Sequence, residues 1–242
     1  MINSSDVLHD FNVNKNTKVT VINVGNEATP IIVIDQLCEH AEALIDFAEP
    51  ASSFGDAGGF YPGIRKPLPN FYAEQICQHY LSLMQKVYQL DSSSKAQVIL
   101  SALSLAVKPP EQLRPIQTLP HFDTEQTNQF ALVHYLCDQQ HGGTSFYRHR
   151  ETGYESISNA RLSEYGTLLK QQAIQNEIHK NLTYINCDHY LFEQMYKVDA
   201  KMNKAIIYPS NILHSGNINT KTGLPCDVKI GRLTTSSFIL IQ

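Results

Sequence analysis

The pattern of apolar and polar residues predicts a chain whose second half is mainly β-strand. Segments 17–24 and 29–34 are rich in β-branched residues, which predicts two short strands near the start. Four later segments also have the spacing of strands: 98–107, 130–136, 204–208 and 232–241. Gly142 and Gly143 permit a sharp reversal from the second of these into 144–147, so a hairpin is predicted there.

Helical spacing of apolar residues separates the early strands from the later ones. It covers residues 35–50 and 70–90, where Asp35 and Asn70 are the candidate N-caps. The segment between them, 51–69, is rich in Gly, Pro and Ser and is predicted to be an irregular loop. The two helices are therefore expected to support a sheet from one side.

Two later segments, 161–180 and 190–200, carry helix-forming residues and few breakers, and both are predicted to be helical. They form a helical insertion over about 159–203 in a β-region that spans 96–242. The preceding part, 1–95, supplies the N-terminal strands and the supporting helices. A chain of 242 residues with this organisation is expected to form one domain.

Composition and charge exclude several classes of protein. Hydrophobic residues make up 42% of the chain, enough for a sizeable core, and the net charge of −4 provides no basic surface for nucleic acid. The five cysteines are scattered without a Cys-x-x-Cys pair, so neither a disulfide framework nor a zinc ribbon is expected. Residues 1–16 are polar and are predicted to be a loose arm. Residues 1–10 have no signal-peptide pattern and no segment is long enough to span a membrane, so a cytoplasmic location without a membrane partner is expected.

One His-x-Asp motif lies in a context that favours metal binding. His121-Phe122-Asp123 precedes the predicted strand 130–136, and on an extended segment residues two apart point to the same face. One imidazole nitrogen and one carboxylate oxygen can then reach one ion. His214, where a later strand would end, can supply a third ligand. Two histidines and one carboxylate on one side of an ion form the facial arrangement of non-heme Fe(II) oxygenases.

The chain contains two other His-x-acid motifs. His40 and Glu42 fall in a predicted helix, where residues two apart point in different directions and cannot converge on an ion. His149 and Glu151 follow an apolar strand and remain a rival pair. A histidine at the end of a strand is also commonly a hydrogen-bonded core residue, so the larger pattern decides the interpretation.

The order of elements resembles the 2-oxoglutarate/Fe(II)-dependent dioxygenase superfamily, and its prolyl-hydroxylase-like branch in particular. The shared features are two leading helices, a strand, His-x-Asp, a strand ending in Tyr-Leu, a Gly-Gly turn, the distant histidine and a final strand that opens with Gly-Arg. The resemblance covers about residues 35–238. Two longer phrases, 61–65 and 142–153, are also similar to an uncharacterised bacterial family within that superfamily.

This resemblance implies a fold and a pair of cofactors. The implied fold is mainly β (α+β), a double-stranded β-helix or jelly-roll barrel with supporting N-terminal helices and a helical excursion. His121, Asp123 and His214 would hold Fe(II), with 2-oxoglutarate as cosubstrate and dioxygen as oxidant. Because Asp123 is present, no coordination position is free for a halide, and hydroxylation is implied over halogenation.

The last strand carries the cosubstrate site that the resemblance implies. Arg232 would pair with the distal carboxylate of 2-oxoglutarate, because a guanidinium can hold a carboxylate through two parallel hydrogen bonds. Thr234 would add a hydroxyl from the same strand face, and Tyr135 a phenol. The alternatives are a salt bridge for Arg232 and a core position for Tyr135. The segment 217–229 is expected to be an extended hairpin, which leaves Lys229 as another candidate anchor.

Four residues are candidates for substrate contacts. Tyr61 and Arg65 lie in a Gly- and Pro-rich loop that could cover the mouth of a barrel, and such loops often carry function. Arg148 and Arg150 could contact an acidic substrate or form a charged sheet edge. The expected substrate is a small molecule or an amino-acid or peptide side chain.

Two other functions use the same residues. A non-catalytic jelly-roll module would bind a small molecule or a protein partner through its apolar pocket. A cupin-like metalloenzyme would use the metal without 2-oxoglutarate. Cupins usually place their ligands as His-x-His followed by Glu and His, and that spacing is absent from the sequence.

Overall fold

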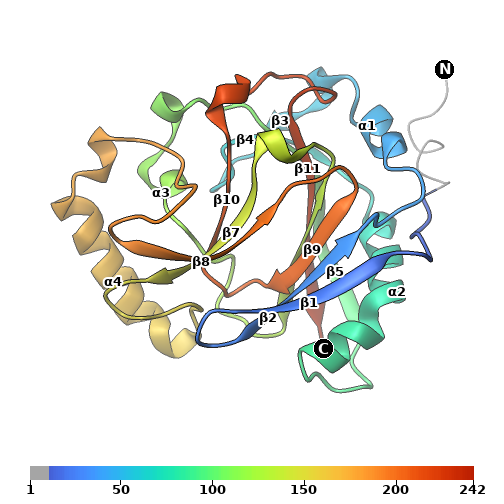
Figure 1. Cartoon of the computed structure of the whole chain (residues 1–242), viewed down its shortest axis with the longest axis horizontal. Helices are drawn as coiled ribbons and strands as arrows, with labels where there is room; N and C mark the ends of the chain where they lie inside the picture. The colour runs from blue at the N-terminus through green and yellow to red at the C-terminus, as the bar shows by residue number, and fades with distance from the viewer. Residues whose placement is uncertain (1–10) are drawn as a thin grey trace.

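The computed structural model describes residues 11–242, which form two antiparallel β-sheets (Figure 1). The predictions made for residues 1–10 lie outside the described residues. In the remainder of the predicted arm, Val13 forms an isolated antiparallel bridge with Cys38. The described chain is mainly antiparallel β-structure with few helices, as predicted.

The large sheet has eight strands in the order β1-β2-β9-β6-β11-β5-β4-β3. Their bounds are β1 Lys18–Val24, β2 Thr29–Asp35, β3 Gly55–Asp56, β4 Gly63–Pro67, β5 Ala96–Ala106, β6 Gln129–Tyr135, β9 Lys204–Pro209 and β11 Arg232–Ile241. β11 pairs with β5 on one side and with β6 on the other. Side chains at matching register on these strands therefore share one face of the sheet.

The small sheet has three strands in the order β10-β7-β8. They are β7 Gly143–His149, β8 Phe192–Asp199 and β10 His214–Gly216. Apolar side chains from both sheets pack together between them, among them Ala131, Ile206 and Tyr208 from the large sheet and Phe146 from the small one. The inner face of the large sheet, meaning the face toward the small sheet, is therefore buried.

Helices cover the outer sides of the two sheets. The α-helices are α1 Glu42–Ala48, α2 Asn70–Val87, α3 Pro115–Thr118 and α4 Asn159–Gln175, and the short 3-10 helices are η2 Ala51–Ser53, η3 Pro110–Gln112, η4 Gln139–His141, η5 Ile178–Lys180 and η6 Thr220–Thr222. α1 and α2 pack on the outer face of the large sheet, as predicted. α4 flanks the small sheet, where Tyr165 packs with Tyr147 and Phe192 (Figure 1).

The first helix begins at Glu42, later than predicted, because strand β2 extends to Asp35 and a non-helical segment follows it. Asp35 ends β2 and is not an N-cap, and Gln36 has a positive φ of 55°. The Leu37 N–H donates to the Asn203 carbonyl, and Cys38 forms a bridge with Val13, so this segment is not helical. The second helix begins where predicted, but Asn70 is its first residue rather than its N-cap.

Two predictions about the later strands are wrong. β6 and β7 form no hairpin: β6 belongs to the large sheet, and the chain crosses to the small sheet before β7 begins at Gly143. Gly142 and Gly143 serve close packing, since an added Cβ would lie 1.9 Å from the Asn217 carbonyl oxygen or 2.0 Å from that of Val198. The segment 190–200 is mostly strand β8 and not a helix, because it pairs with β7 along its length.

The helical excursion is therefore limited to α4 and η5. No helix within residues 11–242 is long and apolar enough to cross a membrane.

Candidate metal centre

The sequence-predicted triad is assembled by a short bridge between two distant segments. The His121 and His214 backbones exchange two N–H to carbonyl hydrogen bonds, each of 2.8 Å. The Asp123 N–H donates to the Ser210 carbonyl at 2.8 Å. β10, which begins at His214, is the edge strand of the small sheet and pairs with β7. Backbone hydrogen bonds to β7, to Ser210 and between the two histidines therefore fix the positions of the triad residues.

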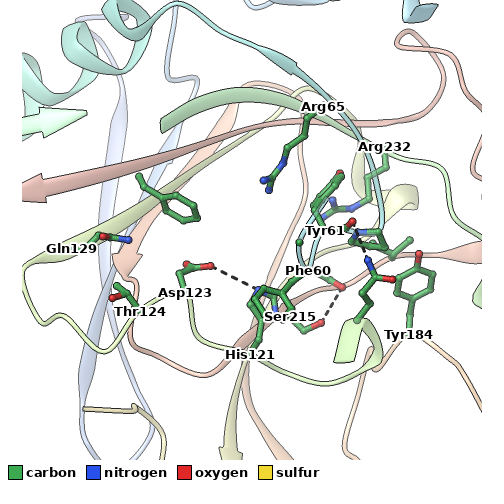
Figure 2. A pocket seen from close by; sticks show the side chains of 16 residues that line it. Phe60, Tyr61, Arg65, His121, Asp123, Thr124, Gln129, Tyr184, Ser215 and Arg232 are labelled. Carbon is green, nitrogen blue, oxygen red and sulfur yellow. Dashed lines mark hydrogen bonds and ion pairs between the residues drawn. The ribbon is translucent and has the colours of Figure 1, made fainter. Parts of the chain in front are cut away.

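The three side chains converge on one point. One ligand atom from each of His121, Asp123 and His214 lies within 4.8 Å of the other two. His121 Nε2 is 3.9 Å from Asp123 Oδ1, and His214 Nε2 is 3.7 Å from Asp123 Oδ2. Figure 2 shows the side chains of Asp123 and His121 directed toward each other among the residues that line a cavity. In the described part of the chain this is the one such cluster of histidine, cysteine and acidic side chains.

The hydrogen bonds of the triad leave its ligand atoms available. His214 Nδ1 donates to the Ile212 carbonyl at 2.9 Å, which places the proton on Nδ1 and leaves the Nε2 lone pair free. Asp123 Oδ2 is buried and has no hydrogen-bond partner among the described residues. A buried acceptor without a partner is costly, and a bound cation would remove that cost.

Burial sets the protonation of the triad. Desolvation, followed by the neighbouring His214, lowers the pKa of His121 to about 4. Desolvation likewise lowers the pKa of His214 to about 4, against the hydrogen bond to Ile212. Burial raises the pKa of Asp123 to about 6, opposed by His121 and Arg65. At neutral pH the site therefore offers two neutral imidazoles and one carboxylate, the forms that bind a divalent metal.

The triad lies between two adjoining cavities. An outer cavity of about 420 Å³ opens beside His121 and Asp123, and an inner one of about 100 Å³ also includes His214. The residues that line both are Tyr61, Arg65, His121, Asp123, Gly216, Arg232 and Phe238. A small ligand could therefore touch the triad and these polar side chains together.

Arg232 lies in both cavities and lacks an acidic partner. Its side chain is buried, and one Nη donates to the Gly143 carbonyl at 2.8 Å. Its Nε has no hydrogen-bond partner, and no acidic side chain of residues 11–242 lies within ion-pair distance. A Cβ at Gly216 would lie 3.4 Å from the guanidinium, so a glycine leaves room for it. The salt-bridge alternative for Arg232 therefore finds no partner in the described chain.

Tyr61 lines both cavities, whereas the predicted cosubstrate contact Tyr135 does not. The Tyr135 hydroxyl donates to Thr144 Oγ1 at 2.7 Å, and Tyr135 lines neither cavity. The Tyr61 hydroxyl is buried and makes no hydrogen bond of standard geometry within residues 11–242. Burial raises its pKa, and Arg232, Arg65 and the neighbouring Thr234 hydroxyl oppose that rise. Thr234 itself contacts the Ser104 carbonyl at 3.4 Å. Tyr61 is therefore an available phenol beside the buried guanidinium.

Several other sequence candidates lie away from the cavities. Lys229 is exposed and forms an ion pair of 2.9 Å with Glu49, and residues 217–231 form an irregular connection containing η6 rather than an extended hairpin. Arg148 is bound by Glu155 and Glu193. Arg150 is 3.6 Å from Asp188. Because these three cations already have acidic partners and line neither cavity, the structure does not bring them to the triad.

The rival histidines also have other surroundings. His149 is buried with Nε2 2.7 Å from Gln172 Oε1 and Nδ1 3.0 Å from Thr152 Oγ1, so both its nitrogens are satisfied. His40 and Glu42 contact each other on an exposed surface. Neither motif gathers a third ligand in the part of the chain that the structure describes.

Sequence reasoning missed residues that complete the cavity walls. Ser236 and Phe238 line the inner cavity on the β11 face that carries Arg232, and the two-residue strand period could have identified them. Phe60 is 56% exposed, and its ring stacks on His121 with centroids 6.3 Å apart. No local pattern identifies Phe60, because its place depends on how the loop folds over the sheet.

Solved structures with a similar fold were found, all at low sequence identity. HygX from Streptomyces hygroscopicus, crystallised with nickel, 2-oxoglutarate and hygromycin B, is 12% identical with a TM-score of 0.51, covering 88% of this chain and 83% of HygX. The non-heme alpha ketoglutarate dependent epimerase SnoN from nogalamycin biosynthesis is 12% identical with a TM-score of 0.42, and the match covers 87% of this chain and 77% of SnoN. A Pseudomonas putida prolyl-4-hydroxylase is 10% identical with a TM-score of 0.35, and the match covers 84% of this chain and 83% of the hydroxylase.

The likeness to HygX is one of fold, and it confirms the resemblance to 2-oxoglutarate/Fe(II) oxygenases at that level. The chain itself belongs to the family of unknown function DUF6445, whose profile matches residues 15–239. A search of curated protein sequences found no match.

Proposed function

We propose that this protein is a non-heme Fe(II)- and 2-oxoglutarate-dependent oxygenase that hydroxylates a small molecule or an amino-acid or peptide side chain. One observation carries the proposal: the cluster of three candidate metal ligands and the buried Arg232, which has no acidic partner within residues 11–242, line the same cavity. The two facing sheets are consistent with a single double-stranded β-helix, or jelly-roll, domain. The similar fold of HygX, which binds nickel and 2-oxoglutarate, supports the same interpretation.

His121, Asp123 and His214 would hold the metal on one side. Two nitrogens and one carboxylate oxygen suit iron(II) and leave the other coordination positions open to ligands. The Ile212 carbonyl keeps the His214 proton on Nδ1, so that Nε2 would be free to bind the ion. The unpartnered Asp123 Oδ2 would gain the partner that the protein does not supply.

Arg232, Thr234 and Tyr61 would receive the distal carboxylate of 2-oxoglutarate. The Arg232 guanidinium still has an unused Nε–H, and Tyr61 an unused hydroxyl. Tyr135 would then position Thr144 rather than contact 2-oxoglutarate. Its hydroxyl donates to Thr144 Oγ1, and Thr144 lines the inner cavity. Both guanidinium and phenol are donors at neutral pH, so a dicarboxylate fits better here than a neutral molecule.

Iron(II) with 2-oxoglutarate bound would supply dioxygen activation and C–H oxidation. The protein's own contribution is to position and to exclude water. Burial keeps both histidines neutral, and the apolar inner faces of the two sheets limit the inner cavity to a small volume. Asp123 would fill the coordination position that a halide needs, which favours hydroxylation over halogenation.

Anaerobic titration of the protein with Fe(II) and then 2-oxoglutarate tests the proposal. We expect a visible charge-transfer absorption that appears only when both are present, and conversion of 2-oxoglutarate to succinate once air is admitted. Metal binding without any response to 2-oxoglutarate would contradict the proposal and favour a cupin-like metalloenzyme. Binding of neither would favour a non-catalytic module.

A further inference from the structure

Arg65 is a second guanidinium in the cavities. It lies on β4, in register with Ser104 of β5, which is itself in register with Thr234 of β11, so these side chains share the inner face of the large sheet. Its Nε donates to Ser104 Oγ at 3.1 Å, and its guanidinium carbon lies 4.8 Å from the Tyr61 ring centroid. Figure 2 shows the guanidinium pointing into the cavity. These contacts fix the direction of the side chain without neutralising it.

The other half-buried arginines of the described chain differ in this respect. Arg148 is bound by two glutamates, and Arg161 lies against Glu27 at 2.5 Å. Within residues 11–242, neither Arg65 nor Arg232 has an acidic side chain within ion-pair distance. A buried arginine without an ion-pair partner, such as Arg232, is costly unless a ligand provides the counter-charge. Arg65 is half-buried, and its charge lowers the pKa of Asp123 without forming an ion pair with it. One dicarboxylate cosubstrate at Arg232 accounts for only one of these two cations.

The surroundings of Arg65 indicate what else the ligand carries. Arg65 lines the outer cavity together with Phe238 and the exposed Phe60, whose ring stacks on His121. The outer cavity, at about 420 Å³, is larger than the inner one at about 100 Å³. A molecule in the outer cavity would meet a cation and two aromatic faces beside the triad.

We propose that Arg65 binds a carboxylate of the primary substrate, which makes that substrate a small organic or amino acid with an apolar portion. This inference rests on the proposed function, in which Arg232 holds 2-oxoglutarate. Arg65 pairs with the carboxylate, and the carbon skeleton lies against Phe60 and Phe238 near the metal. Arg65 is then a specificity-determining residue and not a second cosubstrate anchor.

Acetate, the smallest carboxylate with a carbon skeleton, is a suitable probe. The protein is first loaded with Mn(II) and saturating 2-oxoglutarate, and binding of each is measured in that order. Acetate is then titrated in, and the relaxation of its methyl protons by bound Mn(II) is followed by NMR. Acetamide, of the same shape but uncharged, is the matched ligand control. We expect strong relaxation of acetate and little of acetamide.

Arg65→Gln and Arg65→Lys identify the residue responsible. We expect Arg65→Gln to weaken acetate binding by about tenfold or more and Arg65→Lys to restore part of it, because a charged partner strengthens a hydrogen bond. Arg150→Gln, on the surface outside the cavities, should behave as wild type. The affinity for 2-oxoglutarate should be unchanged in Arg150→Gln, and in the two Arg65 variants it should fall much less than the affinity for acetate, because Arg65 contacts Tyr61 but not the proposed anchor Arg232.

The order of titration separates the two proposals. Failure to bind Mn(II) and 2-oxoglutarate would refute the proposed function, and this inference with it. Normal loading with equal relaxation of acetate in Arg65→Gln and wild type, or of acetamide and acetate, would overturn this inference alone. A large loss of 2-oxoglutarate affinity in Arg65→Gln would also overturn it, by making Arg65 part of the cosubstrate site.

Discussion

The outer and inner faces of the large sheet both bury polar side chains, but only the outer face satisfies them. On the outer face, His134 Nδ1 lies 2.8 Å from the Tyr72 hydroxyl and its Nε2 lies 3.1 Å from Asn203 Oδ1. The Tyr72 hydroxyl is also 3.1 Å from Thr235 Oγ1. Every polar atom in this chain of contacts has a partner within the protein. The result is a rigid link between α2 and the sheet.

The inner face differs, because some buried polar atoms in the cavity beside it lack hydrogen-bond partners. In the cavity over this face, Arg232 Nε from β11 and two groups from loops, the Tyr61 hydroxyl and Asp123 Oδ2, are buried without hydrogen-bond partners among the described residues. Desolvation lowers the pKa of His214 and of His134 alike, each to about 4, so burial alone does not distinguish the two histidines. The distinguishing feature is the missing partner. The three unpartnered groups gather in one cavity, which fits the proposal that a ligand binds there.

The largest expected effect is on metal binding. Asp123→Ala removes the only carboxylate of the triad, and we expect the affinity for Mn(II) to fall by at least about 100-fold, with no measurable 2-oxoglutarate turnover. Isothermal titration calorimetry measures the affinity. His40→Ala, in the exposed His-x-Glu motif, is the control and should bind Mn(II) as wild type does. Equal affinity in Asp123→Ala and wild type would refute the metal site.

Substitutions at His134 and at Asp123 should change the free energy of unfolding in opposite directions. In metal-free protein at pH 7, His134→Leu should lower the free energy of unfolding by about 2 kcal/mol, since it removes the two hydrogen bonds that the imidazole makes with the Tyr72 hydroxyl and Asn203 Oδ1. Asp123→Asn should raise it by about 1 kcal/mol, because a buried charge without a hydrogen-bond partner is removed. Urea unfolding measures both. Similar losses in the two variants would erase the proposed difference between the faces.

The pH dependence should isolate the contribution of His134. Its pKa is lowered from 6.5 to about 4, so the unfolded chain binds a proton below pH 6.5 that the folded protein refuses. The stability from neutral His134 is full above pH 6.5 and falls as the pH approaches 4, by a loss on the order of 2 kcal/mol between pH 7 and 4.5. The stability advantage of wild type over His134→Leu should shrink by that amount. A constant difference across this range would contradict the expectation.

Cosubstrate binding should depend on the inner face alone. Arg232→Ala should weaken 2-oxoglutarate binding by about tenfold or more, because it removes a charged hydrogen-bond donor. The measurement is a 2-oxoglutarate titration of the Mn(II)-loaded protein. Lys229→Ala, which removes the ion pair with Glu49, should leave the affinity unchanged. The reverse pattern would move the anchor to Lys229.

A smaller effect should separate the two tyrosines. Tyr61→Phe removes the unpartnered hydroxyl, and we expect 2-oxoglutarate binding to weaken by about threefold to tenfold, as for one neutral hydrogen bond. Tyr135→Phe should change the affinity less, because its hydroxyl contacts Thr144 rather than the cavity. A larger effect in Tyr135→Phe would restore the assignment made from the sequence.

The sequence predicted the elements whose periodicity is local. The helix from Asn70, the strand pattern of 232–241 and the grouping of Arg232 with Thr234 on one face all follow from periods of 3.6 and 2. The gathering of His121, Asp123 and His214 also agrees with expectation, since the motif and the distant histidine suited one ion. These predictions needed only the chain's own spacing and chemistry.

The tertiary structure decided which segments are partners. Residues 190–200 have helix-forming composition, yet pairing with β7 makes most of them strand β8, and β6 joins β9 and β11 rather than β7. In the same way Thr144 occupies the hydroxyl of Tyr135 while that of Tyr61 stays free. A strand's partner and a hydroxyl's contact depend on how separate segments pack in three dimensions, and local periodicity carries no information about that packing.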